Sequence, residues 1–245
     1  MISDVWTVMW KEWRELLIQR GSLRGGALGL LVVVAVFSIV LPLQIGSDWV
    51  ESPMVLFFAG WVPFVSTAHV VADSFAGERE RHTLETLLAS RLSNQAILFG
   101  KVCTAVSYGW GLTLLILFLG LVTVNLVHGC GELLLYQGII GLGSIALSLL
   151  GAGLAASAGV LISLRASTVR QAQQTLSFAA WLLPIILGYG GRALPVEWRA
   201  HLVEAMTASG MTGIVFVVIA TLIVLDIGLL AVAMARFQRA RLILD

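Results

Sequence analysis

The sequence predicts an all-α membrane protein with six transmembrane helices and both termini in the cytoplasm. Composition is the first reason, because 58% of the 245 residues are hydrophobic and only 12% are charged, against about 25% charged residues in soluble domains. The second reason is that apolar runs close to the length that crosses a hydrocarbon core recur along the whole chain. The third is that basic residues collect on one side of the predicted membrane. The whole chain, 1–245, is therefore predicted to be one membrane domain.

Six apolar runs are predicted to span the membrane. The fifth is the shortest and contains Pro184. The runs cover residues 27–43, 54–72, 102–127, 133–164, 176–188 and 213–235. Residues 1–26 precede the first run and no small-residue cleavage site follows it, so we expect this run to stay as an anchor and not to be removed as a signal peptide.

The positions of Lys and Arg predict the orientation. With six spans, only Arg192 and Arg199 of the 15 basic residues fall outside, and the remaining thirteen lie on one side. Cytoplasmic loops carry the excess of Lys and Arg in membrane proteins. The N-terminus and the C-terminus are therefore both predicted to be cytoplasmic, and an odd number of spans would lose this bias.

Residues 1–24 are predicted to form a cytoplasmic amphipathic helix. Aromatic and aliphatic side chains recur at helical spacing in it, at Trp6, Trp10, Trp13 and Leu17. Its charged residues fall on other faces, at Lys11, Glu12, Arg14 and Glu15. Such a helix lies in the membrane interface, with its rings at the headgroup level and its basic groups near anionic lipid. The alternative is a helix that packs against a partner protein.

The fourth run is rich in small residues. Gly151, Ala155 and Gly159 stand four apart, and so do the residues of a second strip, Ser144, Ser148, Ala152 and Ala156. Small residues let helix backbones approach closely in lipid. We therefore expect a buried packing helix, either within the subunit or across a dimer.

Residues 189–212 are predicted to form a loop and a short helix outside the membrane. The glycines of 188–191 are expected to break the fifth helix, and Pro195 is suited to the start of a new one. The expected helix, 196–208, is too short to span and carries Trp198, Leu202 and Met206 on one face.

The sequence contains no residue pattern that predicts catalysis or metal binding. It lacks a zinc motif and a nucleophile elbow. Gly100-Lys101 resembles the end of a phosphate loop, but Gln95 and Val102 replace the glycine and the Ser or Thr that such a loop requires. We therefore expect no bound cofactor, no metal and no nucleic-acid partner. Ser66 and His69 stand three apart and leave an intramembrane protease formally possible, but packing and hydrogen-bonding roles are favoured, because nothing nearby would orient the base or supply an oxyanion hole.

Asp226 and His69 are the candidate transport-path residues. Asp226 lies near the middle of the sixth run, where a carboxylate costs about 2.5–3.5 kcal/mol. It is predicted either to contact a proton, cation or substrate, or to be a protonated group that bonds to a neighbouring helix. His69, with Asp73, presents the same choice, and a structural role is favoured there.

Residues 73–101 are predicted to be a charged cytoplasmic segment between the second and third runs. Glu78 with Arg81, and Arg81 with Glu85, have the spacing of helical ion pairs. Leu84, Leu87 and Leu88 form an apolar stripe on the same helix, and Ser93 is placed to cap the next one. Such a segment would serve as a rigid lever that offers charges to a soluble partner, or it would be only a solvated loop.

This segment resembles the ABC-2 type permeases, the membrane subunits of one class of ATP-binding cassette transporters. Their pattern here runs F-x-x-E-R-E-x-G-T-L-E-x-L-L-x-T-P-V-S-x-x-x-I-L-x-G-K. His82 and Arg91 depart from it, in place of glycine and proline. The matching residues are Phe75, Glu78, Arg79, Glu80, Thr83, Leu84, Glu85, Leu87, Leu88, Ser93, Ile97, Leu98, Gly100 and Lys101.

The resemblance implies a non-catalytic permease subunit in the inner (plasma) membrane of a prokaryotic cell. Two copies, or two related subunits, would pair and sit on two ABC ATPase subunits that bind ATP and Mg²⁺ and drive export. The residues implied in coupling to the ATPase are Glu78, Arg79, Glu80, Arg81, Thr83, Leu84, Glu85, Leu87 and Leu88. The helix of residues 1–24 would complete the docking surface.

Two other functions remain open at this point. One is a haem-exporter-like subunit of cytochrome maturation. The other is an ATP-independent secondary carrier that uses Asp226 as its proton or cation site. The sequence does not identify the substrate, because one fold serves many substrates.

Overall fold

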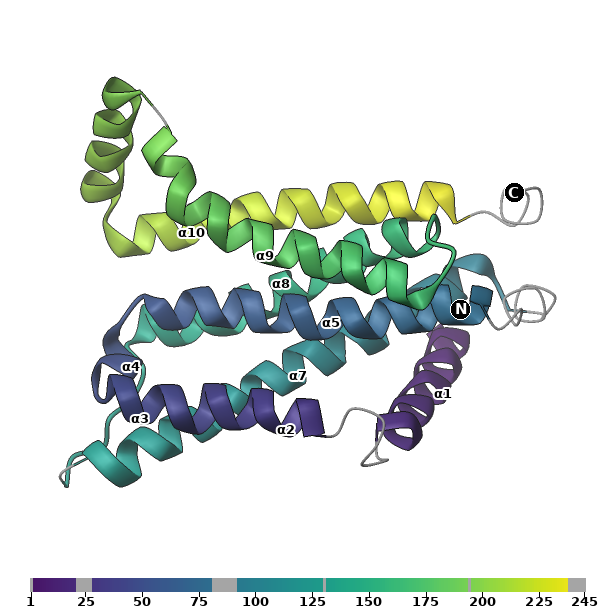
Figure 1. The fold of residues 1–245 in the computed structure, drawn as a ribbon, viewed down its shortest axis with the longest axis horizontal. Coiled ribbons are helices and arrows are strands. Elements are labelled where there is room, and N and C mark those ends of the chain that lie inside the picture. The colour runs from purple at the N-terminus through teal and green to yellow at the C-terminus, as the bar shows by residue number, and fades with distance from the viewer. Residues whose placement is uncertain (1, 21–27, 81–91, 130, 194, 238–245) are drawn as a thin grey trace.

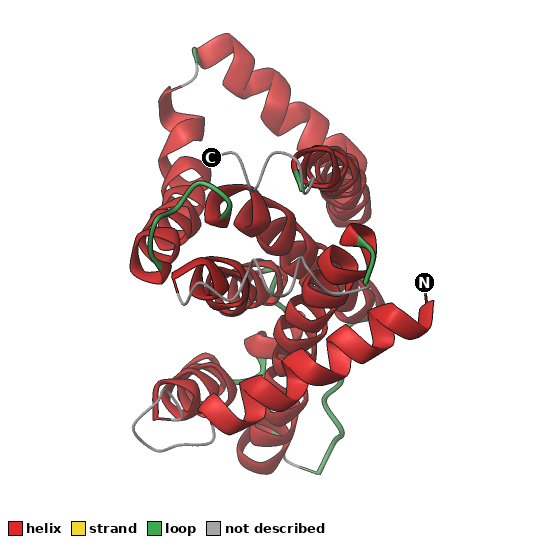
Figure 2. Cartoon of the chain, turned by 90° about the vertical axis from the view of Figure 1, so that its right-hand side faces the viewer, coloured by secondary structure: helices red, strands yellow, loops and turns green. Residues whose placement is uncertain are grey.

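A computed structural model describes most of the chain as a bundle of long helices (Figure 1). The described residues are 2–20, 28–80, 92–129, 131–193 and 195–237. Within them every regular element is helical, which confirms the predicted all-α class. Both termini lie at the same end of the bundle, which we call the terminal end, and Figure 2 views the molecule from that end.

Five described helices are long and apolar enough to cross a membrane. They are Leu28–Ile45, α5 (Met54–Glu80), α7 (Asn94–His128), α8 (Gly138–Ser163) and Gly210–Arg236. Each overlaps one of the predicted runs. α9 (Val169–Ala193), which contains the fifth predicted run, is not among the five.

The first spanning helix is built from three short pieces in series. These are α2 (Leu28–Ala35), a π-helical turn η2 (Val36–Val40) and α3 (Leu41–Ile45). The buried Ser38 hydroxyl donates to the carbonyl oxygen of Val34 at 2.6 Å within this stretch. A short helix, α4 (Asp48–Glu51), then leads into α5.

A chain of hydrogen bonds closes the end of the bundle opposite the termini. The indole N–H of the buried Trp49 donates to the Tyr136 hydroxyl at 3.2 Å, and that hydroxyl donates to the carbonyl oxygen of Leu117 on α7 at 3.0 Å. Burial raises the pKa of Tyr136 to about 12. The phenol therefore keeps its proton at physiological pH and remains a donor.

α8 begins at Gly138, so the prediction that a helix runs from residue 133 was wrong at this end. The reason lies in α7. The side-chain amide of Asn125 donates to the carbonyl oxygen of Leu134 and its side-chain oxygen accepts from the Leu134 N–H, both at 2.8 Å. Because these bonds occupy both polar groups of the Leu134 backbone, residues 133–137 are held as a non-helical connection.

The small-residue strips of α8 are buried, as predicted, and they pack within the subunit. α5 approaches so closely that a Cβ added to Gly151 would strike the Gly60 carbonyl oxygen, and one added to Gly159 would lie 2.8 Å from a methyl of Val71. The buried members of the two strips are Ser144, Ser148, Gly151, Ala152, Ala155, Ala156 and Gly159. α8 is therefore the central packing helix beside α5.

α9 continues through the glycines of 188–191 to Ala193, so the predicted break there was wrong. Nor does Pro184 end it. Proline has no N–H to donate to the carbonyl four residues earlier, here Ala180. The indole N–H of Trp61 on α5 donates to that carbonyl at 3.0 Å instead. The bond satisfies the oxygen that the proline leaves free and ties α9 to α5.

Trp61→Phe should therefore destabilise the protein by about 1–3 kcal/mol, because the Ala180 carbonyl loses its donor. Pro184→Ala in the same chain should remove most of this loss, since residue 184 then supplies the missing N–H. Thermal unfolding of the two single variants and the double variant in detergent measures the coupling. Equal losses for Trp61→Phe in both backgrounds would contradict it.

α10 (Val196–Arg236) contains a sharp break at Gly210. This glycine has φ 62° and ψ 178°, a conformation that side-chain-bearing residues rarely adopt. Pro195 precedes the first helical residue. A helix thus occupies 196–209 and turns away from the bundle (Figure 1). The side chains of Trp198, Leu202 and Met206 lie outside the described part of the structure.

The N-terminal helix α1 (Ile2–Arg20) packs on α7 of its own chain. Val8 and Leu16 are buried, and a Cβ added to Gly100 of α7 would lie 2.6 Å from Val8. Trp6 and Trp10 are more than 60% exposed. The predicted aromatic face is divided, however, because the indole of Trp13 is turned to α7 and donates to Ser107 at 3.3 Å.

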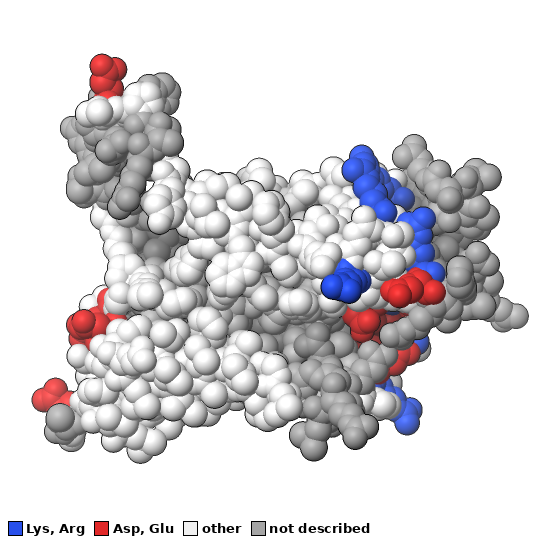
Figure 3. Space-filling view, viewed as in Figure 1, with Lys and Arg blue, Asp and Glu red and all other residues white. Residues whose placement is uncertain are grey.

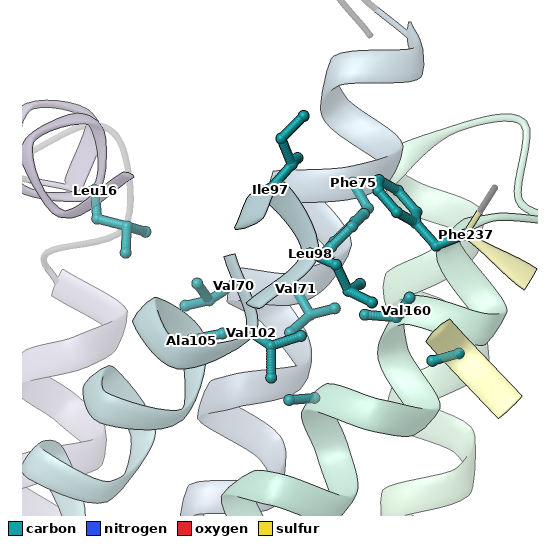
Figure 4. Close-up of a cluster of buried hydrophobic side chains, with 12 residues drawn as sticks. Leu16, Val70, Val71, Phe75, Ile97, Leu98, Val102, Ala105, Val160 and Phe237 are labelled. Atoms are coloured by element: carbon teal, nitrogen blue, oxygen red, sulfur yellow. The ribbon is translucent and has the colours of Figure 1, made fainter. Parts of the chain in front are cut away.

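An apolar core at the terminal end joins α1 to the spanning helices (Figure 4). It brings together residues from α1, α5, α7 and α8, with Phe237 packed edge-on against Phe75. Its labelled members are Leu16, Val70, Val71, Phe75, Ile97, Leu98, Val102, Ala105, Val160 and Phe237. The charged residues described next lie at this same end.

Candidate functional site

The charged end of α5 is the described start of the predicted coupling segment. Figure 3 shows Lys and Arg side chains gathered at the terminal end of the molecule. No charged side chain is seen in the middle of the face that this view shows. Glu78, Arg79 and Glu80 are the last residues of α5. The other residues predicted to couple to the ATPase, Arg81, Thr83, Leu84, Glu85, Leu87 and Leu88, lie outside the described residues. Ser93 caps α7 as predicted, accepting from the Ala96 N–H at 3.2 Å.

Lys101 is buried at this end between two carboxylates. Its side chain is only 1% exposed, and its Nζ lies 2.8 Å from Glu12 Oε1 and 2.9 Å from Glu78 Oε1. The three residues come from α7, α1 and α5. Ser74 completes the group, since its carbonyl and hydroxyl oxygens both lie 3.0 Å from Nζ and its hydroxyl donates to Glu12 Oε2 at 2.9 Å. We call Glu12, Ser74, Glu78 and Lys101 the Lys101 cluster.

Lys11 lies at the rim of the Lys101 cluster and completes its charge balance. Its Nζ is 3.5 Å from Glu78, 3.7 Å from Glu12 and 3.4 Å from Glu15. Partial burial lowers the pKa of Lys11, but these three carboxylates outweigh it and the net pKa is raised. Two ammonium groups, Lys11 and Lys101, thus face the two carboxylates of the cluster.

The Lys101 cluster was not predicted from the sequence. Glu12 was assigned to a charged face of the N-terminal helix, and Lys101 was considered only for orientation, for the phosphate-loop pattern and for the family pattern. A signal was present: Glu12 stands four residues from both Val8 and Leu16, so it interrupts a stripe that is otherwise apolar and buried. A carboxylate in such a stripe needs a buried cation, but the stripe does not say which one.

Arg79 and Glu80 contact the turn between α8 and α9. Arg79 Nη1 donates to the carbonyl oxygen of Leu164, just past the end of α8, at 2.7 Å. Glu80 Oε2 accepts from the N–H of Val169, the first residue of α9, at 3.0 Å. Helix C-terminal ends attract cations and N-terminal ends attract anions. The two charges therefore match the two helix ends that they touch.

The structure does not bring the two candidate transport-path residues to one site. Asp226 faces α8, where its carboxylate lies so close to Gly153 that an added Cβ would be 2.8 Å from Oδ2. His69 lines a cavity of about 450 Å³ between α2, α5, α7 and α9, together with Ser66, Tyr108 and Gln173. They lie on different faces of the bundle.

A second cavity, of about 590 Å³, lies between α5, α8, α9 and α10. Its lining is apolar and includes Phe57, Phe64 and Leu154. Trp61 lines this cavity and also the one that contains His69. Both volumes fall in the usual range of about 300–1,000 Å³ for ligand sites, and the tryptophan that bonds to Ala180 stands between them.

Among the residues that the structure describes, no group of three or more His, Cys, Asp or Glu side chains is arranged to hold a metal. The Lys101 cluster, Arg79 and Glu80 fix the end of α5 to α1, α7, α8 and α9.

Comparison with known proteins identifies the family. The family model described as ABC-2 type transporter matches residues 3–191, more than half of the chain. A search of curated proteins found no match. The matched region includes α1, the charged end of α5 and most of the bundle. The chain therefore belongs to the ABC-2 type transporter family and is a multi-pass membrane protein, the permease subunit of an ABC transporter.

Proposed function

We propose that this subunit has six spans, with both termini in the cytoplasm, and that α9, which contains the fifth predicted run, spans the membrane in addition to the five helices named above. α9 has 25 residues, which at about 1.5 Å per residue is long enough for a hydrocarbon core of about 30 Å. It also packs beside α5 and α8. The shared location of the termini and the basic side chains at that end support a cytoplasmic assignment.

We further propose that the permease works with two copies of a separate ABC ATPase and with a second permease subunit. ATP and Mg²⁺ would bind to the ATPase, and the complex would export its substrate across the inner membrane. The exposed Trp6 and Trp10 of α1 support contact with the lipid interface. The observation that carries the proposal is the end of α5, whose charges bind it to four other helices. A force applied just after Glu80 would therefore reach these four helices.

Glu85→Arg should reduce the amount of ATPase that co-purifies with the permease by at least about tenfold, because reversal of one charge in a charge-paired contact costs several kcal/mol. Quantitative mass spectrometry of the complex, expressed at native level and solubilised in mild detergent, measures the ratio of the two proteins. Glu132→Arg is the matched control, since Glu132 is exposed in the connection between α7 and α8. Failure of the wild-type permease to bring down any ATPase would refute the proposal.

A carrier that uses Asp226 is the second candidate, and the observation that favours it is the buried Oδ1 of Asp226, which has no hydrogen-bond partner among the described residues. Under the leading proposal, Asp226→Asn keeps ATPase activity and raises stability, because a buried charge no longer needs to be accommodated. Under the carrier reading, proteoliposomes of the wild-type chain move protons down an imposed gradient without ATP, and the variant does not. A pH-sensitive dye inside the vesicles distinguishes the two.

A further inference from the structure

Three consecutive charged residues at the end of α5 reach three different parts of the chain. Glu78 pairs with Lys101 of α7 and Lys11 of α1, Arg79 reaches the end of α8, and Glu80 reaches the start of α9. Successive residues of an α-helix point about 100° apart, because 3.6 residues make one turn. Three neighbouring side chains can therefore contact helices on different sides.

The contacts of Lys101 with Glu78 and Glu12 in the Lys101 cluster are largely buried, and we call this group of contacts the buried branch. Lys101 is 1% exposed, and the side chains of Glu12 and Glu78 are 8% and 14% exposed. The Lys101 ammonium also lies 5.5 Å from the centre of the Phe75 ring, within the apolar core of Figure 4. In such surroundings a charge that loses its partner is costly. α1 and α7 should therefore follow the end of α5 when it moves.

The contacts of Arg79 and Glu80 form a second, exposed branch. They bind the residue just past the end of α8 and the first residue of α9, which are joined by only a few residues. Leu164 and Val169 contribute backbone groups that helix ends leave without helical partners. Its two contacts are made by Arg79 and Glu80, whereas in the buried branch Glu78 contacts Lys101.

We infer that Glu78, Arg79 and Glu80 are positioning residues that divide a movement of the coupling segment between two separate helix pairs. The Lys101 cluster moves α1 with α7, and the Leu164–Val169 turn moves α8 with α9. This inference rests on the proposed function, because it takes the partner ATPase as the source of movement. Since the three charges are used within the chain, the partner's contact falls on residues that follow Glu80.

Two sets of substitutions each remove the charges of one branch and keep side chains of similar size. Lys101→Met with Glu12→Gln and Glu78→Gln neutralises the buried branch without leaving an unpaired charge. Arg79→Gln with Glu80→Gln neutralises the exposed branch. Glu15→Gln is the control, because Glu15 is half exposed and pairs with Lys11 on its own helix.

Spin labels report the two movements separately. With Cys103 and Cys130 replaced by Ser, one pair of labels joins Ile18 on α1 to Phe216 on α10, and another joins Thr175 on α9 to Phe216, because neither branch contacts α10. All three labelled positions are exposed. Double electron–electron resonance of the permease–ATPase complex in nanodiscs gives both distances without nucleotide and after trapping with ATP and vanadate.

In the wild type and in Glu15→Gln, both distances should shift on trapping. The buried-branch variant should lose the shift at Ile18 and keep the one at Thr175, and the exposed-branch variant should show the reverse. Loss of both shifts in either variant, or of neither, would overturn the inference. If these charges only stabilised the fold, the two variants would not lose different distance shifts.

Hydrogen exchange of the isolated permease is a second test of the inference, and it does not require the ATPase. The buried-branch variant should speed exchange in α1 at least about tenfold and leave the start of α9 protected, and the exposed-branch variant should do the opposite. Uniform changes across both regions would contradict two branches. If the ATPase does not bind the wild type at all, the proposed function fails, while the exchange result still decides whether the branches are separate.

Discussion

Lys101→Met is expected to destabilise the protein by about 3–5 kcal/mol, the usual cost of breaking a buried ion pair from one side. The substitution leaves the carboxylates of Glu12 and Glu78 largely buried without the ammonium group that lies within 3 Å of both. Most of the protein should then fail to fold. Fluorescence-detected size exclusion and thermal unfolding in detergent measure the loss.

The combined change Lys101→Met, Glu12→Gln and Glu78→Gln should recover most of that stability, because no unpaired charge remains. Lys11→Met is the control: the side chain of Lys11 is 47% exposed, and exposed ion pairs contribute about 0–1 kcal/mol. If Lys101→Met were as mild as Lys11→Met, the Lys101 cluster would not be the buried charge centre described above.

Gly151→Ala should cost about 1–3 kcal/mol or more, the typical cost of overpacking a close contact. The new methyl would strike the carbonyl oxygen of Gly60, and a backbone atom cannot rotate away as a side chain can. α5 and α8 would have to separate. The midpoint of thermal unfolding should fall accordingly.

Gly60→Ala is a matched control from the same contact. A Cβ added to Gly60 meets nothing within 4 Å, and Gly60 lines the 590 Å³ cavity. Alanine is also favoured over glycine in a helix by about 1 kcal/mol, so this variant should be as stable as the wild type or more so. Equal losses from both substitutions would show that α5 and α8 do not pack in the described way.

Local signals predicted the helices well and their ends less well. Ser93 was identified as a cap because its effect depends only on residues three positions away. The start of α8 depends on Asn125, which holds Leu134 through a contact specific to the fold. The end of α9 was predicted too early, because the glycines of 188–191 permit a helix break but do not require one.

The sequence by itself determined the all-helical membrane class, the small-residue face of α8 and the family resemblance of the segment that begins at the end of α5. These depend on composition and on spacings of a few residues. Only the tertiary structure decided which charges meet. Lys101 and Glu12 stand 89 residues apart, and Trp61 and Ala180 stand 119 apart. Pairings over such separations are selected by the packing of whole helices, because many polar residues could satisfy one buried group and only the fold brings one of them within bonding distance.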